Sequence, residues 1–127
     1  MIGALFLLAY AAFNLFFGGC ARSLVAESLA PSGILKATIS VRACRAKQEF
    51  TTELSIITAT QSLPDSPNVL AVQASDGRAT QWSFGGPEIR LTWVADTLLL
   101  VRYSPADRVI RSADRVRGVS IQHAALY

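Results

Sequence analysis

The sequence contains few of the residues from which catalytic and metal-binding sites are built. It has one histidine, two cysteines and one methionine among 127 residues. A metal site made of several histidines is therefore excluded, and His123 is the only imidazole that can serve as a base. We expect no metal and no cofactor.

Familiar catalytic motifs are missing as well. The run Gly85-Gly86-Pro87 has neither the lysine nor the following helical pattern of a phosphate-binding loop. No serine lies in a nucleophile elbow. The carboxylates of Glu88, Asp107 and Asp114 are expected to solubilise strands and loops rather than to work as an acid–base pair. Catalysis is the less favoured interpretation.

Charge is absent from the first 21 residues. Residues 2–21 read IGALFLLAYAAFNLFFGGCA, in which Asn14 is the only strongly polar side chain. An apolar run of this length matches the hydrocarbon thickness of a bilayer. We expect residues 1–21 to be a signal peptide or membrane anchor that takes the chain to a bacterial inner membrane and leaves the remainder on the periplasmic side.

Three fates of this segment are open. Gly18 and Gly19 directly precede Cys20, as at a lipoprotein processing site, so Cys20 is a candidate for lipidation. Phe17 stands where leucine is usual, however, and no Lys or Arg precedes the apolar run. A retained single-span anchor and an ordinary cleaved signal are the alternatives.

The chemical state expected for Cys44 depends on that of Cys20. If Cys20 is acylated, Cys44 is a lone thiol, most simply a small buried apolar residue. If Cys20 keeps its thiol in an oxidising compartment, the two residues can form a disulfide. A catalytic role for Cys44 would need His123, at the far end of the chain, as its base.

Residues 22–127 are expected to form one mainly β domain. Apolar residues take every second position in 35–43 and again in 50–56, which is the pattern of strands with one buried face. Before them, residues 23–29 are expected to extend the N-terminal helix briefly, and Pro31-Ser32-Gly33 makes a turn.

Further strands are predicted at 69–74, at 89–95 and 98–103 around a tight reversal, and less regularly near Val119 and Ile121. The fold class is therefore mainly β, a small antiparallel meander or sandwich of about six strands behind an N-terminal apolar helix. The residues predicted to share its core are Ile39, Val41, Leu54, Ile56, Leu91, Trp93 and Val101.

The net charge of +3 is not gathered into a nucleic-acid footprint, because basic residues and carboxylates alternate along the domain and few aromatic residues lie among them. The local exception is 102–117, with five arginines and two aspartates. This stretch is predicted to contact another envelope protein or anionic lipid, and not nucleic acid. The alternative is that Asp107 and Asp114 pair with neighbouring arginines and that the stretch is only a soluble final strand. Its candidate residues are Arg108, Arg111, Arg115 and Arg117.

The order and spacing of several short segments resemble a family of small exported proteins of Proteobacteria. The segments are Pro31-Ser32-Gly33, Cys44, the strand FTTELSI from Phe50, Asn68-Val69, Gly86-Pro87-Glu88-Ile89, Trp93, Asp96, Leu98, Tyr103, Arg115-Val116 and Gly118-Val119. Residues 45–49 depart from the small loop of that family. The resemblance implies an exported β domain and no particular activity.

Together these features predict a membrane-tethered binding or assembly module without catalysis. The alternative is an envelope hydrolase or inhibitor whose site lies in the loop 75–86, with Asp76, Arg78 and Trp82 as its residues.

Overall fold

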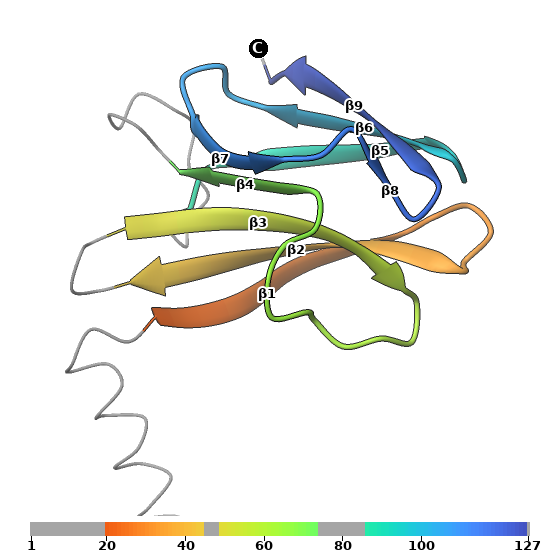
Figure 1. Ribbon diagram of the computed structural model, residues 1–127, viewed down its shortest axis with the longest axis horizontal. Helices are drawn as coiled ribbons and strands as arrows, with labels where there is room; N and C mark the ends of the chain where they lie inside the picture. Colours follow the sequence, from red (N-terminus) through yellow and green to blue (C-terminus); the bar gives the residue numbers. More distant parts are fainter. Residues whose placement is uncertain (1–19, 45–48, 74–85, 127) are drawn as a thin grey trace, which may run out of the picture.

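The computed structural model describes residues 20–44, 49–73 and 86–126, and these ranges contain nine β-strands (Figure 1). The apolar segment 2–19 and most of the loop 75–86 lie outside the described residues. The strands are β1 (Cys20–Leu29), β2 (Leu35–Cys44), β3 (Glu49–Thr58), β4 (Leu70–Gln73), β5 (Ile89–Ala95), β6 (Leu98–Tyr103), β7 (Arg108–Ser112), β8 (Arg115–Val116) and β9 (Val119–Ala125).

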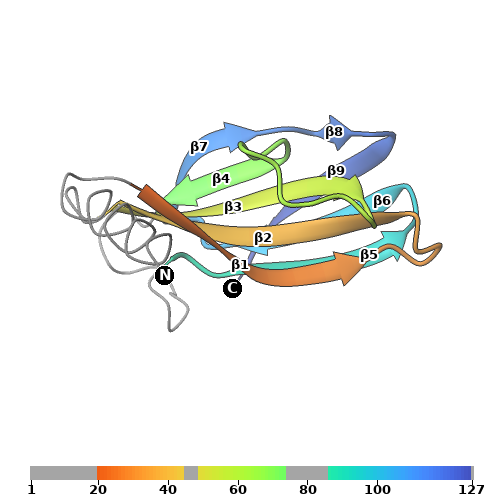
Figure 2. The same ribbon diagram turned by 90° about the horizontal axis from the view of Figure 1, so that it is seen from below.

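The strands form two sheets, so the mainly β prediction is confirmed, whereas the expected number of about six strands is too low. The first sheet has the order β1-β2-β3-β4-β7 and the second has the order β5-β6-β9-β8. All neighbours are antiparallel except β6 and β9, which run parallel. Figure 2 shows β7 and β8 along one side of the two layers and β1 and β5 along the other.

The core lies between the two sheets. Alternate side chains of each sheet point inward, as the two-residue period predicts. Leu91 and Trp93, predicted for the core, are partly buried against it, and Trp93 Nε1 donates a 3.0 Å hydrogen bond to Ser28 O across the layers. The buried cluster consists of Ala37, Ile39, Leu54, Ile56, Val69, Leu70, Val72, Ile89, Leu99, Val101, Val119 and Ile121, with Val41 also buried.

The expectation of a helical extension at residues 23–29 is wrong, since these residues belong to β1. The strand has an irregularity in register between Leu24 and Ala26, and its better-covered residues are Arg22, Val25 and Ser28. Val25 has no register partner, so the shift interrupts the two-residue alternation in the middle of this strand. The pattern by which a strand is recognised in a sequence is therefore missing from residues 23–29.

A disulfide joins the ends of the first two strands. Cys20 and Cys44 are register partners in β1 and β2, and their sulfur atoms are bonded. Strand β1 thus begins two residues before the expected domain boundary at Arg22. The bond lies at the end of the sandwich where residues 1–19 join it, which we call the disulfide end.

The face of the first sheet that is turned away from the second sheet, the outer face, is polar and yet largely buried. Thr38, Ser40 and Ser55 are at most 2% exposed. The connection between β3 and β4 crosses this face (Figure 1). Asn68 fixes the connection with two 2.8 Å hydrogen bonds to the backbone of Ile56.

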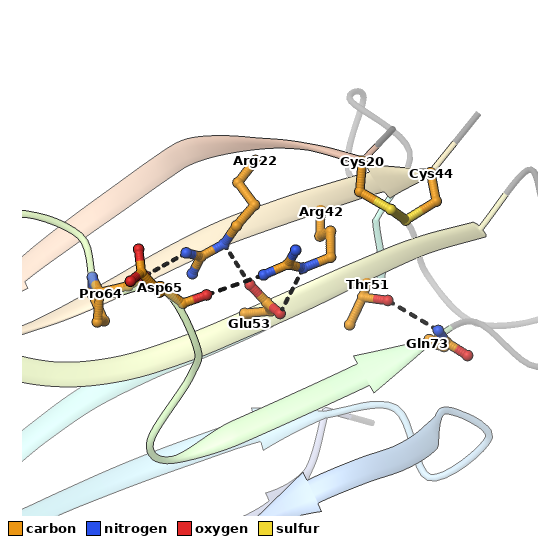
Figure 3. A network of polar contacts seen from close by, with 9 residues as sticks. All are labelled: Cys20, Arg22, Arg42, Cys44, Thr51, Glu53, Pro64, Asp65 and Gln73. Carbon is orange, nitrogen blue, oxygen red and sulfur yellow. Dashed lines mark hydrogen bonds and ion pairs between the residues drawn. A yellow bond between two sulfur atoms is a disulfide. The ribbon is translucent and has the colours of Figure 1, made fainter. Parts of the chain in front are cut away.

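An arginine–glutamate–arginine cluster holds the tip of this connection (Figure 3). Glu53, 5% exposed, accepts Arg22 Nε at 2.9 Å and Arg42 Nε at 3.2 Å. The two guanidinium groups then donate to the carbonyls of Pro64 and Asp65. One buried carboxylate therefore orients two cations that together anchor the loop over strands β1 to β3.

Candidate functional site

Strand β7 is the most exposed strand of the first sheet. Each of its five residues is exposed, including the aliphatic side chains of Val109 (44%) and Ile110 (52%). One edge of β7 pairs with β4, and in the described ranges no strand pairs with the other edge. An unpaired edge that carries aliphatic side chains is a template for an additional strand.

A bulge in β7 brings two predicted site residues together. Arg108 pairs with Gln73 and Arg111 pairs with Ala71, two positions apart on β4, so Ile110 is the extra residue. Residues three apart in a regular strand point to opposite faces, whereas here Arg108 and Arg111 share one face. The bulge could not be predicted from the sequence.

This shared face is the outer face. Gln73 donates a 3.0 Å hydrogen bond to Thr51, and Thr51 is in register with Arg42 and then with Arg22. Arg108 therefore ends a polar row that crosses all five strands of the first sheet near the disulfide end.

The other two predicted arginines lie elsewhere. Arg115 pairs with Ser120 in the second sheet, and Ser120 is level with Leu98 at the turn between β5 and β6. Arg117, with φ of 53°, forms the next turn with Gly118. All four arginines are exposed, Arg108 and Arg111 on β7 of the first sheet and Arg115 and Arg117 on or beside β8 of the second sheet.

The neighbouring aspartates do not neutralise these arginines. The carboxyl group of Asp107 is buried and has a hydrogen bond with the backbone of Ser104, and the carboxylate of Asp114 lies 3.5 Å from Nε2 of His123. Within 20–44, 49–73 and 86–126, no ion pair involves Arg108 or Arg111.

His123 connects the two sheets instead of acting as a base. Its Nε2 lies 3.0 Å from Ala113 O, which can only accept, so Nε2 carries the proton and Nδ1 accepts from the Tyr103 hydroxyl at 3.2 Å. Ser112 Oγ lies 3.5 Å from the same Nε2 and cannot give its proton to an atom that already holds one. This geometry does not activate a nucleophile.

No family model, curated protein or solved structure matches the chain. The resemblance to exported proteins of Proteobacteria stays a prediction.

The features suggested for catalysis are not brought together in the described residues. Glu88 pairs with Arg90 at 3.1 Å, Asp107 lies before β7, and Asp114 follows it. The residues Asp76, Arg78 and Trp82 of the alternative site lie outside the described ranges. At the end of that loop, Gly86 is buried, and a Cβ there would lie 2.6 Å from Thr52 Oγ1.

Two hollows open on the surface of the described part. One, of about 260 Å³, is lined by Tyr103, Pro105, His123, Ala124 and Ala125. The other, of about 280 Å³, lies beside β1 and is lined mainly by small and aliphatic side chains.

Burial and the charges of Asp107 and Asp114 raise the pKa of Tyr103. No group of three metal-ligating side chains occurs in the described ranges.

Cys20 has its sulfur bonded to Cys44, and one sulfur atom cannot also carry a diacylglycerol thioether. Of the alternatives for the cysteines, the structure has the disulfide. Neither cysteine is free.

No helix among the residues described has the length and apolar character needed to cross a membrane.

The buried carboxyl of Asp107 predicts a pH dependence. Burial raises its pKa from 3.8 to about 6, although the Ser104 backbone acts in the opposite direction. Because the folded-state pKa is raised, the stabilising contribution of the protonated form is complete below pH 3.8 and is lost as the pH rises through about 6.

We therefore expect Asp107→Asn to increase the free energy of unfolding by about 1–3 kcal/mol at pH 7.5 and to have little effect at pH 3.5. Urea denaturation of both proteins at the two pH values measures this. Asp114→Asn is the matched control, since the Asp114 side chain is 94% exposed. An equal effect of Asp107→Asn at both pH values would contradict the assignment.

Proposed function

We propose that the protein is a non-catalytic binding module of the bacterial envelope, tethered to the inner membrane by its apolar segment, and that it binds a partner protein along β7. The observation that carries this proposal is the β7 edge, where every residue is exposed, Val109 and Ile110 offer aliphatic surface, and Arg108 and Arg111 share a face. Soluble proteins normally protect such an edge.

Two features support the periplasmic location. Residues 2–19 have the length and composition of a membrane-spanning segment. The Cys20–Cys44 disulfide directly follows that segment, and disulfides persist in oxidising compartments such as the periplasm. Because the disulfide occupies the sulfur of Cys20, we favour a retained single span over lipid attachment.

Site-specific photo-crosslinking in intact cells tests the binding role. A photoreactive amino acid at position 110 is expected to give a discrete adduct with another envelope protein, because Ile110 is 52% exposed on a strand whose second edge pairs with no described strand. The matched control is position 94, because Val94 is 57% exposed and lies on β5, at the other side of the sandwich. Equal labelling from both positions, or none from position 110, would contradict the proposal.

A further inference from the structure

We propose that β7 binds an extended acidic segment of its partner, which adds to the first sheet as a sixth strand. This inference rests on the proposed function and specifies the chemistry of the partner. Strand addition supplies affinity through main-chain hydrogen bonds and specificity through alternate side chains.

The charges on β7 set the first requirement. Arg108 and Arg111 are level with Gln73 and Ala71, which are two positions apart on β4. Two positions along a strand correspond to about 7 Å. In an added strand, residues i and i+2 have the same spacing and point to the same face. Carboxylates at those two positions would each lie opposite an arginine.

The opposite face of β7 sets the second requirement. Val109 pairs with Val72, a core residue, and yet it is 44% exposed. The residue between the two acidic positions of an added strand would point to this face. An aliphatic side chain there would cover Val109 and remove apolar surface from water. The predicted motif is therefore acidic–aliphatic–acidic.

The same observations favour a strand over a lipid surface. A bilayer offers no partner for the main-chain groups of the β7 edge, with which no described strand pairs. An extended acidic segment satisfies the backbone, the two arginines and the exposed aliphatic side chains together.

The test uses the full chain in a neutral detergent and two fluorescent peptides, one of alternating Glu and Val and one of alternating Lys and Val. We expect the Glu peptide to bind and the Lys peptide not to bind, as measured by fluorescence anisotropy. The variant Arg108→Glu/Arg111→Glu is expected to lose at least about tenfold in affinity for the Glu peptide and to gain binding of the Lys peptide.

The matched control is Arg115→Glu/Arg117→Glu, which changes the net charge equally at a different place. Its affinity for the Glu peptide should fall by less than about threefold, because Arg115 and Arg117 lie on or beside β8 of the second sheet, where they would not be opposite the added strand, and salt weakens the attraction of exposed charges that are not in contact. A Glu peptide with alternate amides methylated on the edge that faces β7 should not bind. Equal losses in the two double variants, or full binding of the methylated peptide, would overturn strand addition.

Micelles doped with phosphatidylglycerol provide the lipid arm. If the doped micelles displace no Glu peptide, the acidic strand is supported. If doped micelles compete with the peptide in a way that requires Arg108 and Arg111, while methylation is without effect, the surface binds lipid headgroups and the proposal fails. If the adduct at position 110 forms in cells but the Glu peptide does not bind, the acidic strand is rejected and the proposed function is not. Absence of the adduct would reject the proposed function itself.

Discussion

Replacement of Glu53 by glutamine is expected to lower the free energy of unfolding by about 3 kcal/mol. The carboxylate is almost inaccessible and accepts hydrogen bonds from both Arg22 and Arg42, so its neutralisation leaves two guanidinium groups without a counter-charge. Removing one partner from a buried ion cluster typically costs about 3–5 kcal/mol, and the partial exposure of Arg42 places this case at the lower end.

Urea denaturation monitored by tryptophan fluorescence measures the effect of Glu53→Gln. The matched control is Glu27→Gln, because Glu27 also accepts from a cation, Lys36 at 3.1 Å, but its side chain is 44% exposed. An exposed pair contributes about 0–1 kcal/mol. Similar losses for the two variants would show that the cluster on the outer face has no special role.

Loss of the disulfide is expected to destabilise the protein by about 3 kcal/mol. The bond joins residues separated by 24 positions, and a closed loop of that length restricts the unfolded chain by about this amount. It also holds together the first register pair of β1 and β2. Strand β1 has only one neighbour in the described part of the first sheet, and most of its side chains are exposed. Without the bond, β1 should separate from β2, starting at the disulfide end.

Two measurements on Cys20→Ser/Cys44→Ser check this expectation. The free energy of unfolding should fall, and amide hydrogen exchange should accelerate in β1 more than in β3 or β6, which have neighbours on both sides. Wild-type protein treated with a reductant should behave like the double variant. Unchanged stability, or equal acceleration in all strands, would contradict the role given to the disulfide.

The regular strands could be predicted from the sequence because each buries one face. The alternation in 35–43 and 50–56 corresponds to β2 and β3, and the reversal at Asp96 and Thr97 joins β5 to β6. The alternation did not show that the outer face of β2 and β3 is also covered. The residues of that face are polar, and nothing in the alternation indicates that the connection after β3 folds back over them.

Strands β1 and β7 could not be predicted, because each has a shift in register near its middle and an extra residue moves every following side chain to the other face. The shift in β5 lies near its end, after the alternation by which that strand was predicted. In β7 the same bulge determines the candidate site, because it places Arg108 and Arg111 on one face. The sequence predicted the arginines, but their division between two sheets depends on tertiary pairing.

The position of the disulfide links the domain to its proposed tether. Cys20 is both the first residue of β1 and the residue that follows the apolar segment, and β1 forms one edge of the first sheet. The proposed binding strand β7 forms the other edge of that sheet. A partner bound to β7 would therefore not compete with the tether for the same strand.

An intact-mass measurement on non-reduced protein recovered from inner membranes tests the tethered module most directly. The predicted mass includes residues 2–19 and lacks two hydrogen atoms, which return on reduction of the Cys20–Cys44 bond. A mass without residues 1–19 and with a diacylglycerol group on Cys20 would contradict this prediction and show that the protein is a lipoprotein. A mass without those residues and without lipid would show that it is not tethered.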